Sequence, residues 1–127
     1  MRQAVVHFEI IGADPAGLRD YYGRLFGWEF DCSSPVSPAI SEPDDYGFAA
    51  HDAEREGVGI PGGVGGGADF DAHTVFYVSV ADVEAALLNA ERLGGTRILG
   101  PSTSPSGLVI GQFVDPAGNR VGVVGPK

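Results

Sequence analysis

The sequence predicts an α+β fold made of two βαβββ modules whose curved sheets form a cupped, partly open β-barrel with a cavity. One observation is that each half opens with a strand pattern followed directly by an amphipathic helix pattern. The other is an internal repeat. Moving the first half along by 68 residues superimposes identical residues at positions that define a strand, a helix N-cap, a helix and a helix C-cap: Phe8 on Phe76, Asp14 on Asp82, Arg24 on Arg92, Leu25 on Leu93, and Gly27 on Gly95.

Composition suits one domain that needs no covalent or metal reinforcement. The chain has 127 residues, 43% of them hydrophobic, and we expect a single domain over residues 1–127. Cys32 is the only cysteine, which excludes an internal disulfide and a cysteine-based zinc cluster. Seventeen acidic against eight basic residues give a net charge of −9, which argues against nucleic acid as a partner. Since there is neither a run of ~20 apolar residues nor a signal-peptide pattern, we expect no membrane partner and a cytoplasmic location.

The first module is expected to span residues 1–62 and to open with a strand over residues 4–11. β-branched and aromatic residues favour this strand. Because side chains alternate between the two faces of a strand, His7 and Glu9 share one face.

A helix follows the first strand. Asp14 is a good N-cap, Pro15 suits the first helical position and Gly27 suits the C-terminal end. Residues 28–30 are expected to form the next strand. The helix should pack on the sheet through an apolar stripe: Leu18, Tyr21, Tyr22, Leu25 and Phe26.

The middle of the chain is the least patterned part. Prolines and acidic residues in 31–45 predict a loop or short edge strands. Strands are plausible at 46–51 and 57–60. Residues 62–69 are almost all glycine and are expected to form a flexible connector between the modules.

The second module is expected over residues 70–127 and repeats the pattern of the first. A strand at 73–80 leads to an N-cap at Asp82 and a helix that ends at Gly94. Turn signals at residues 100–101, 105–107 and 115–119 then separate three strands, at residues 97–99, 108–114 and 120–124.

Several motifs now stand in a specific order: H-F-E-I, D-P-x-x-L-x-x-Y-Y-x-x-L-F-G-W, F-Y-V-x-V-x-D-V, L-G-G and D-P-A-G-N. Together they resemble the glyoxalase/bleomycin resistance protein/extradiol dioxygenase superfamily, also called the vicinal oxygen chelate (VOC) superfamily. The resemblance runs nearly end to end and is weakest at residues 31–56. It implies the paired-module fold. It does not choose a function, because the superfamily spans metal-dependent isomerases, epimerases, dioxygenases, thiol transferases and metal-free antibiotic-binding proteins.

The resemblance also implies where a metal would bind. In metal-using members, the ligands stand on the first and last strands of each module. The matching positions here are His7, Gly59, Val75 and Gly122, and only His7 is a residue that can coordinate a metal. An open divalent site needs about three protein ligands, so we predict no cofactor. An alternative stays open, in which His7 and His73 or loop acids hold a divalent metal.

Several side chains are candidates for lining the cavity. His7 has three possible roles: the remaining member of a lost metal-ligand set, a general base, or a polar residue that lines the cavity. Glu9 either forms hydrogen bonds with nearby groups, or it serves as a partner for His7 or for a cationic ligand. Tyr77 and Ser79 lie on the equivalent face of the second module, and Arg120 either reaches the cavity mouth to meet an anion or is solvated. The expected ligand-binding set is His7, Glu9, Gly59, Tyr77, Ser79, Arg120 and Gly122.

Two functions remain open at this point. The first is a small-molecule-binding protein of the glyoxalase/bleomycin-resistance type without the full metal site, in which glycines at ligand positions widen the cavity. The net charge of −9 favours a cationic ligand for it. The second is a divalent-metal-dependent lyase, isomerase or dioxygenase-like enzyme acting on a small oxygenated substrate. No catalytic residue is assigned, and the resemblance implies a homodimer.

Overall fold

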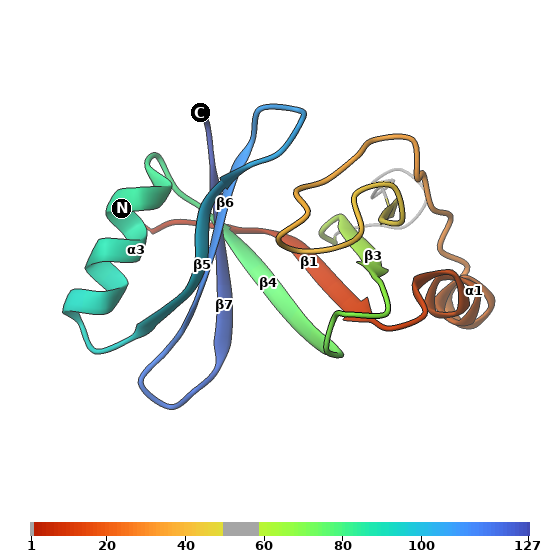
Figure 1. Cartoon of the computed structure of the whole chain (residues 1–127), viewed down its shortest axis with the longest axis horizontal. Coiled ribbons are helices and arrows are strands. Elements are labelled where there is room, and N and C mark those ends of the chain that lie inside the picture. Colours follow the sequence, from red (N-terminus) through yellow and green to blue (C-terminus); the bar gives the residue numbers. More distant parts are fainter. Residues whose placement is uncertain (1, 50–58) are drawn as a thin grey trace. The chain divides into compact units, whose positions relative to one another are not determined.

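A computed structural model of the chain describes residues 2–49 and 59–127. The chain divides into two compact units. The N-terminal unit comprises residues 7–74, and the C-terminal unit comprises residues 75–127 together with residues 1–6. Figure 1 shows the helices and strands of both.

The N-terminal unit carries one helix and three strands. These are β1 (Val5–Gly12, whose first two residues belong to the other unit), α1 (Pro15–Phe26), β2 (Gly47–Ala49) and β3 (Gly62–Gly66). Their order in the sheet is β2-β3-β1. β3 runs parallel to β1 and antiparallel to β2, and α1 lies against β3.

The predicted caps of α1 are confirmed. The Asp14 carboxylate accepts a hydrogen bond from the Gly17 amide at 3.1 Å, which satisfies one of the free N–H groups of the first turn. At the other end, Gly27 adopts a left-handed conformation with φ of 75°. Both ends of the helix are therefore set by local sequence.

The predicted burial of the α1 stripe is wrong in part. Tyr21, Leu25 and Phe26 are 59%, 55% and 58% exposed. The aromatic rings pack on one another instead: the Trp28 ring centroid lies 5.7 Å from that of Tyr22 and 5.1 Å from that of Phe26. A row of rings thus forms along the helix.

The strand predicted at residues 28–30 is absent from the structure. The chain here makes only an isolated bridge between Asp31 and Phe48. The Trp28 ring instead lies 5.2 Å from the ring of Phe8, centroid to centroid. This contact holds the segment against β1 through a side chain rather than through backbone pairing.

The glycine-rich run is a buried strand rather than a flexible connector. β3 occupies residues 62–66, and all five are buried. A Cβ atom on Gly62 would lie 2.0 Å from the Phe8 ring, so glycine is needed because aromatic rings cover this backbone. The strand predicted at 57–60 is displaced accordingly, since Gly59 and Ile60 are exposed and lie outside any strand. The last strand of the first module is therefore at 62–66, and residues 57 and 58 lie outside the described residues.

The elements predicted for the C-terminal unit are confirmed. They are β4 (His73–Ser79, whose first two residues belong to the other unit), α3 (Val83–Arg92), β5 (Thr96–Thr103), β6 (Val109–Val114) and β7 (Arg120–Gly125). The sheet order is β4-β7-β6-β5, with β4 and β7 parallel and the other pairs antiparallel. α3 packs across β5, β6 and β7 (Figure 1). The buried core between helix and sheet consists of Val80, Val83, Leu87 and Val123.

One predicted turn lies inside a strand. Residues 100–101 belong to β5, and the pairing of β5 with β6 shifts register between Leu99 and Ser102. A bulge of this kind accommodates a proline within a strand. The turns at residues 104–107 and 115–119 are present as expected. The α+β fold class is confirmed. Within the described residues, no helix is long and apolar enough to cross a membrane.

Candidate functional site

The N-terminal unit holds a chain of three hydrogen-bonded side chains. β1 places His7 and Glu9 on one face, and Tyr46 stands directly before β2. The Tyr46 hydroxyl donates to Glu9 Oε1 at 3.0 Å and lies 2.9 Å from His7 Nε2. Because the hydroxyl hydrogen goes to Glu9, the His7 Nε2–H must be the donor to Tyr46. His7 is therefore in the Nε2–H tautomer.

His7 is held in its neutral form. Burial lowers its pKa from 6.5 to about 4, because a charged imidazolium loses hydration there. The Phe48 ring, 6.0 Å away between centroids, contributes to these apolar surroundings. A general base works best with a pKa near the working pH. The geometry thus favours a neutral polar lining residue over a general base at neutral pH.

Glu9 is a buried carboxylate that serves a local partner. Glu9 and Tyr46 are each 1% exposed. The Tyr46 hydroxyl contacts both Glu9 and His7, so the pairing of these two residues that the sequence suggested runs through a tyrosine. Sequence analysis missed Tyr46, since its two partners are 37 and 39 residues away and no local pattern connects them.

The C-terminal unit holds a second polar row. Gln112 Nε2 donates to the Tyr77 hydroxyl oxygen at 2.7 Å, and Arg120 Nη1 donates to Gln112 Oε1 at 3.0 Å. Tyr77 and Gln112 are 2% and 1% exposed, and Arg120 is partly buried. Strand register aligns them, because Gly122 of β7 pairs with Tyr77 on one side and with Gln112 on the other.

Two residues differ from the sequence expectation for this row. Ser79 is exposed and is joined to the fold through its amide, which donates to the Ala4 carbonyl at 2.9 Å. Gln112 was not singled out, although its pattern carries a signal. It is the one amide on a strand face whose neighbours two residues away are Ile110 and Val114. A buried amide in such a place needs hydrogen-bond partners.

Two of the four positions that the family resemblance assigns to metal ligands carry glycines covered by tyrosine rings. Glu9 pairs with Gly63 in β3 just as Tyr77 pairs with Gly122 in β7. Gly63, rather than the predicted Gly59, is thus the counterpart of Gly122. A Cβ on Gly63 would lie 2.1 Å from the Tyr46 ring, and one on Gly122 would lie 2.4 Å from the Tyr77 ring. The expectation that Gly122 widens a cavity is not met, because the Tyr77 ring occupies the space beside it.

The residues present do not fit the metal set implied by the family. Val75, at the third ligand position, is apolar and 5% exposed. His73 Nδ1 lies 2.8 Å from the Asp71 carbonyl oxygen. In residues 2–49 and 59–127, no group of three or more His, Cys, Asp or Glu side chains is placed to hold a metal ion.

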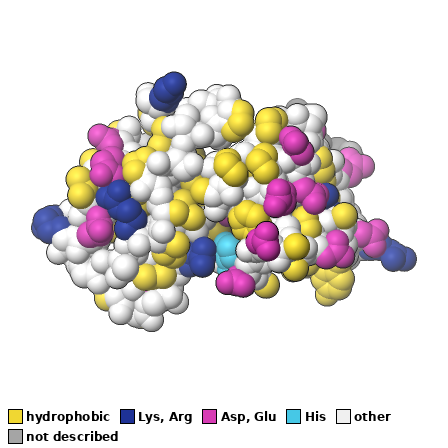
Figure 2. Space-filling view, viewed as in Figure 1, with side chains coloured by type: hydrophobic (Ala, Val, Ile, Leu, Met, Phe, Trp, Pro, Cys, Tyr) yellow, Lys and Arg dark blue, Asp and Glu magenta, His cyan; other side chains and the backbone are white. Residues whose placement is uncertain are grey.

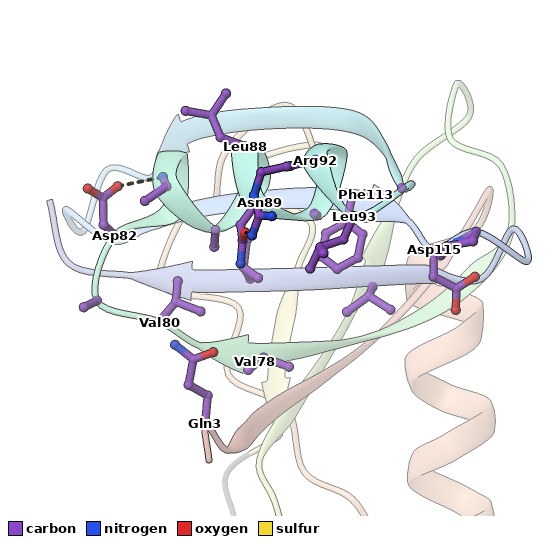
Figure 3. A pocket seen from close by; sticks show the side chains of 18 residues that line it. Gln3, Val78, Val80, Asp82, Leu88, Asn89, Arg92, Leu93, Phe113 and Asp115 are labelled. Atoms are coloured by element: carbon purple, nitrogen blue, oxygen red, sulfur yellow. Dashed lines mark hydrogen bonds between the residues drawn. The ribbon is translucent and has the colours of Figure 1, made fainter. Parts of the chain in front are cut away.

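The C-terminal unit also has a groove beneath α3. It is a groove of about 960 Å³ between α3 and the sheet of the C-terminal unit, with Leu88, Leu93 and Phe113 among its walls (Figure 3). Its acidic groups serve the fold: Asp82 caps α3 through the Ala85 amide, and Asp115 accepts hydrogen bonds within its own turn. None of the predicted site residues lines it. The N-terminal unit has a similar groove of about 600 Å³ beside α1.

The negative charge forms no single patch on the face in view. In Figure 2, acidic side chains lie at several separate places with basic side chains among them.

Comparison with known proteins places this fold in a family. The model for the Glyoxalase/Bleomycin resistance protein/Dioxygenase superfamily matches residues 4–123. No curated protein sequence matches the chain.

Several solved structures share the fold at low sequence identity. A methylmalonyl-CoA epimerase from Streptomyces coelicolor is 14% identical with a TM-score of 0.65, covering 99% of this chain and 96% of its own. The Mycobacterium tuberculosis methylmalonyl-CoA epimerase is 14% identical with a TM-score of 0.58, covering 97% and 87%. A structure described as an NAD-dependent benzaldehyde dehydrogenase from Legionella pneumophila is 16% identical with a TM-score of 0.60, covering 95% and 98%. On the family match and this shared fold, the chain belongs to the Glyoxalase/Bleomycin resistance protein/Dioxygenase superfamily.

Proposed function

We propose that the chain is a small-molecule-binding member of its superfamily that binds its ligand without the family's metal set. The observation that supports this most is the pair of glycines at ligand positions, Gly63 and Gly122, each covered by a tyrosine ring. The Tyr46 and Tyr77 hydroxyls are fixed by hydrogen bonds to neighbouring side chains, and polar groups fixed in this way are the kind that orient a small organic ligand. A homodimer and a cytoplasmic location stay predictions.

A calorimetric screen tests the proposal. Wild-type protein in EDTA is titrated with cationic, neutral and anionic small molecules. We expect a ligand with a Kd below about 1 mM, a threshold of roughly 4 kcal/mol of binding free energy. The affinity should fall in Tyr46→Phe, which loses a buried hydroxyl, and should not change in Tyr21→Phe, which loses an exposed one. Binding that appears only after a divalent ion is added would contradict the proposal.

A metal-dependent lyase or isomerase is the second candidate. One observation favours it: His7 is neutral, which is the form that coordinates a metal. Elemental analysis after exposure to Ni²⁺, Zn²⁺, Mn²⁺ or Fe²⁺ and dialysis decides between the two. Near-stoichiometric metal in wild type that is lost in His7→Ala would make this candidate the better one.

A further inference from the structure

We propose that the chain associates with a second copy of itself, and that an apolar row on α1 of one molecule docks into the groove beneath α3 of the other. The α1 row consists of three exposed side chains: Tyr21, Leu25 and Phe26. This association is independent of the small molecule that the chain binds.

The first support is that both units carry the same groove, which is wider in the C-terminal unit. The 68-residue repeat superimposes residues that line the two grooves: Asp14 on Asp82, Leu18 on Ala86, and Tyr22 on Ala90. In the N-terminal unit, where Leu18 and Tyr22 occupy part of the space, the groove measures about 600 Å³. With alanines at both positions, the groove beneath α3 measures about 960 Å³ and has room for side chains from another molecule.

The second support is that both surfaces are apolar and face the solvent. Leu88 and Leu93, which line the groove beneath α3, are 56% and 66% exposed, much like the α1 row. Exposed apolar patches mark sites of protein association. A helix that lays apolar side chains four residues apart into an apolar groove is a recurring mode of protein recognition, and Tyr21 and Leu25 have this spacing.

The third support is that the charges beside the two surfaces are complementary. Arg24 and Asp20 are 82% and 67% exposed and lie one turn apart on α1. The groove carries Arg92 and Asp115, and Figure 3 shows Leu93 between them. Among the described residues, Arg92 makes no ion pair. One orientation of α1 in the groove pairs Asp20 with Arg92. It also pairs Arg24 with Asp115, so the chain itself supplies the partner that this groove fits.

Analytical ultracentrifugation of the full-length protein tests the association with matched leucine-to-glutamate variants. Leu25→Glu puts a charge into the α1 row, and Leu93→Glu puts one into the groove. Leu108→Glu is the control, because Leu108 is 51% exposed and lies outside both surfaces. We expect wild type and Leu108→Glu to associate alike, and each of the other two variants to associate about tenfold or more weakly, as for the loss of an interface anchor.

A mixture of the two weakened variants shows which surfaces meet. Leu25→Glu keeps an intact groove, and Leu93→Glu keeps an intact α1 row. Together they should form a one-to-one complex and nothing larger, because only one of the two heterologous contacts is left. Contacts between two α1 rows, or between two grooves, would weaken only one of the variants and would give no complex on mixing.

Charge reversal tests the orientation of α1 in the groove. Asp20→Arg and Arg92→Asp should each weaken the association about two- to fivefold, as for an exposed ion pair. The double variant should recover it, since opposite charges face each other again. A double variant weaker than either single variant would reject this pairing.

Three results would overturn the docking as a whole. The first is a wild type that stays monomeric at its highest soluble concentration. The second is an equal loss in Leu25→Glu, Leu93→Glu and Leu108→Glu. The third is a mixture of Leu25→Glu and Leu93→Glu that forms no complex.

Discussion

The Tyr46 hydroxyl connects a buried acid, Glu9, to a partly buried histidine, His7, so its removal is expected to destabilise the fold. Tyr46→Phe deprives the 1% exposed Glu9 carboxylate of this donor. We expect a loss of about 1–3 kcal/mol in the free energy of unfolding, since a buried polar group that loses a hydrogen-bond partner costs this much. Urea denaturation measures it. Tyr21→Phe, at an exposed position, should stay within about 0.5 kcal/mol of wild type, and equal effects in the two variants would contradict the prediction.

His7 gives the protein a pH dependence of known sign. Its pKa in the folded state, about 4, lies below the ordinary 6.5, so folding favours the neutral form. The contribution is complete above pH 6.5 and is lost as the pH falls toward 4, because the unfolded chain binds the proton first. We expect a loss of about 2–3 kcal/mol, from roughly 1.4 kcal/mol per pKa unit reduced for partial solvent access.

His7→Gln isolates this contribution from that of the carboxylates. Denaturation of wild type and variant at several pH values between 7 and 4 gives the difference in unfolding free energy at each pH. The wild type should lose stability relative to the variant over this range. A constant difference would show that His7 titrates normally.

At the scale of elements, two strands depend on glycines that lie under tyrosine rings. Gly122→Ala puts a methyl group 2.4 Å from the Tyr77 ring, which must move. Overpacking of this kind costs about 1–3 kcal/mol. In a Tyr77→Ala background the same substitution should cost much less, and thermal or urea unfolding of the four proteins gives the coupling energy. An equal cost in both backgrounds would locate the strain in the backbone.

The elements that the sequence predicted best are those whose ends are marked by local signals, such as helix-capping residues and turn glycines. α3 has Asp82 as its N-cap, and the turns after β5 and β6 contain Gly107 and Gly118 in left-handed conformations. β3 carries no such signal. Its glycines look like those of a flexible linker in the sequence. Glycine is required here because the rings of Phe8 and Tyr46, which are distant in sequence, leave no room for a Cβ atom.

The residues of the candidate site likewise fall into those that local sequence identifies and those that depend on distant contacts. Strand alternation placed His7 and Glu9 on one face, because one face of a strand can be inferred from its own residues, and the 68-residue repeat placed Tyr77 on the equivalent face. It did not identify Tyr46 or Gln112, whose roles depend on contacts 37 and 35 residues away. Likewise, the stripe of α1 predicted the helix but not which neighbours its aromatic residues would meet.

At the scale of the whole molecule, the two units share a tyrosine–glycine contact but differ in the hydrogen bonds that the tyrosine makes. Both units place a tyrosine over a glycine of the last strand. The hydrogen bonds differ, since Tyr46 donates to a carboxylate whereas Tyr77 accepts from an amide. Neither unit thus repeats the hydrogen bonding of the other.

The response of the intact protein to metal ions follows from this asymmetry. A resident ion at one hundred times its Kd would stabilise the fold by about 2.7 kcal/mol, which raises the melting temperature by several degrees. We expect no such rise with Ni²⁺, Zn²⁺, Mn²⁺ or Fe²⁺ relative to EDTA, measured by differential scanning calorimetry. Mg²⁺ serves as the control for weak binding to the surface acids of a chain with a net charge of −9. A rise specific to one transition metal and absent in His7→Ala would show that His7 recruits ligands outside the family positions.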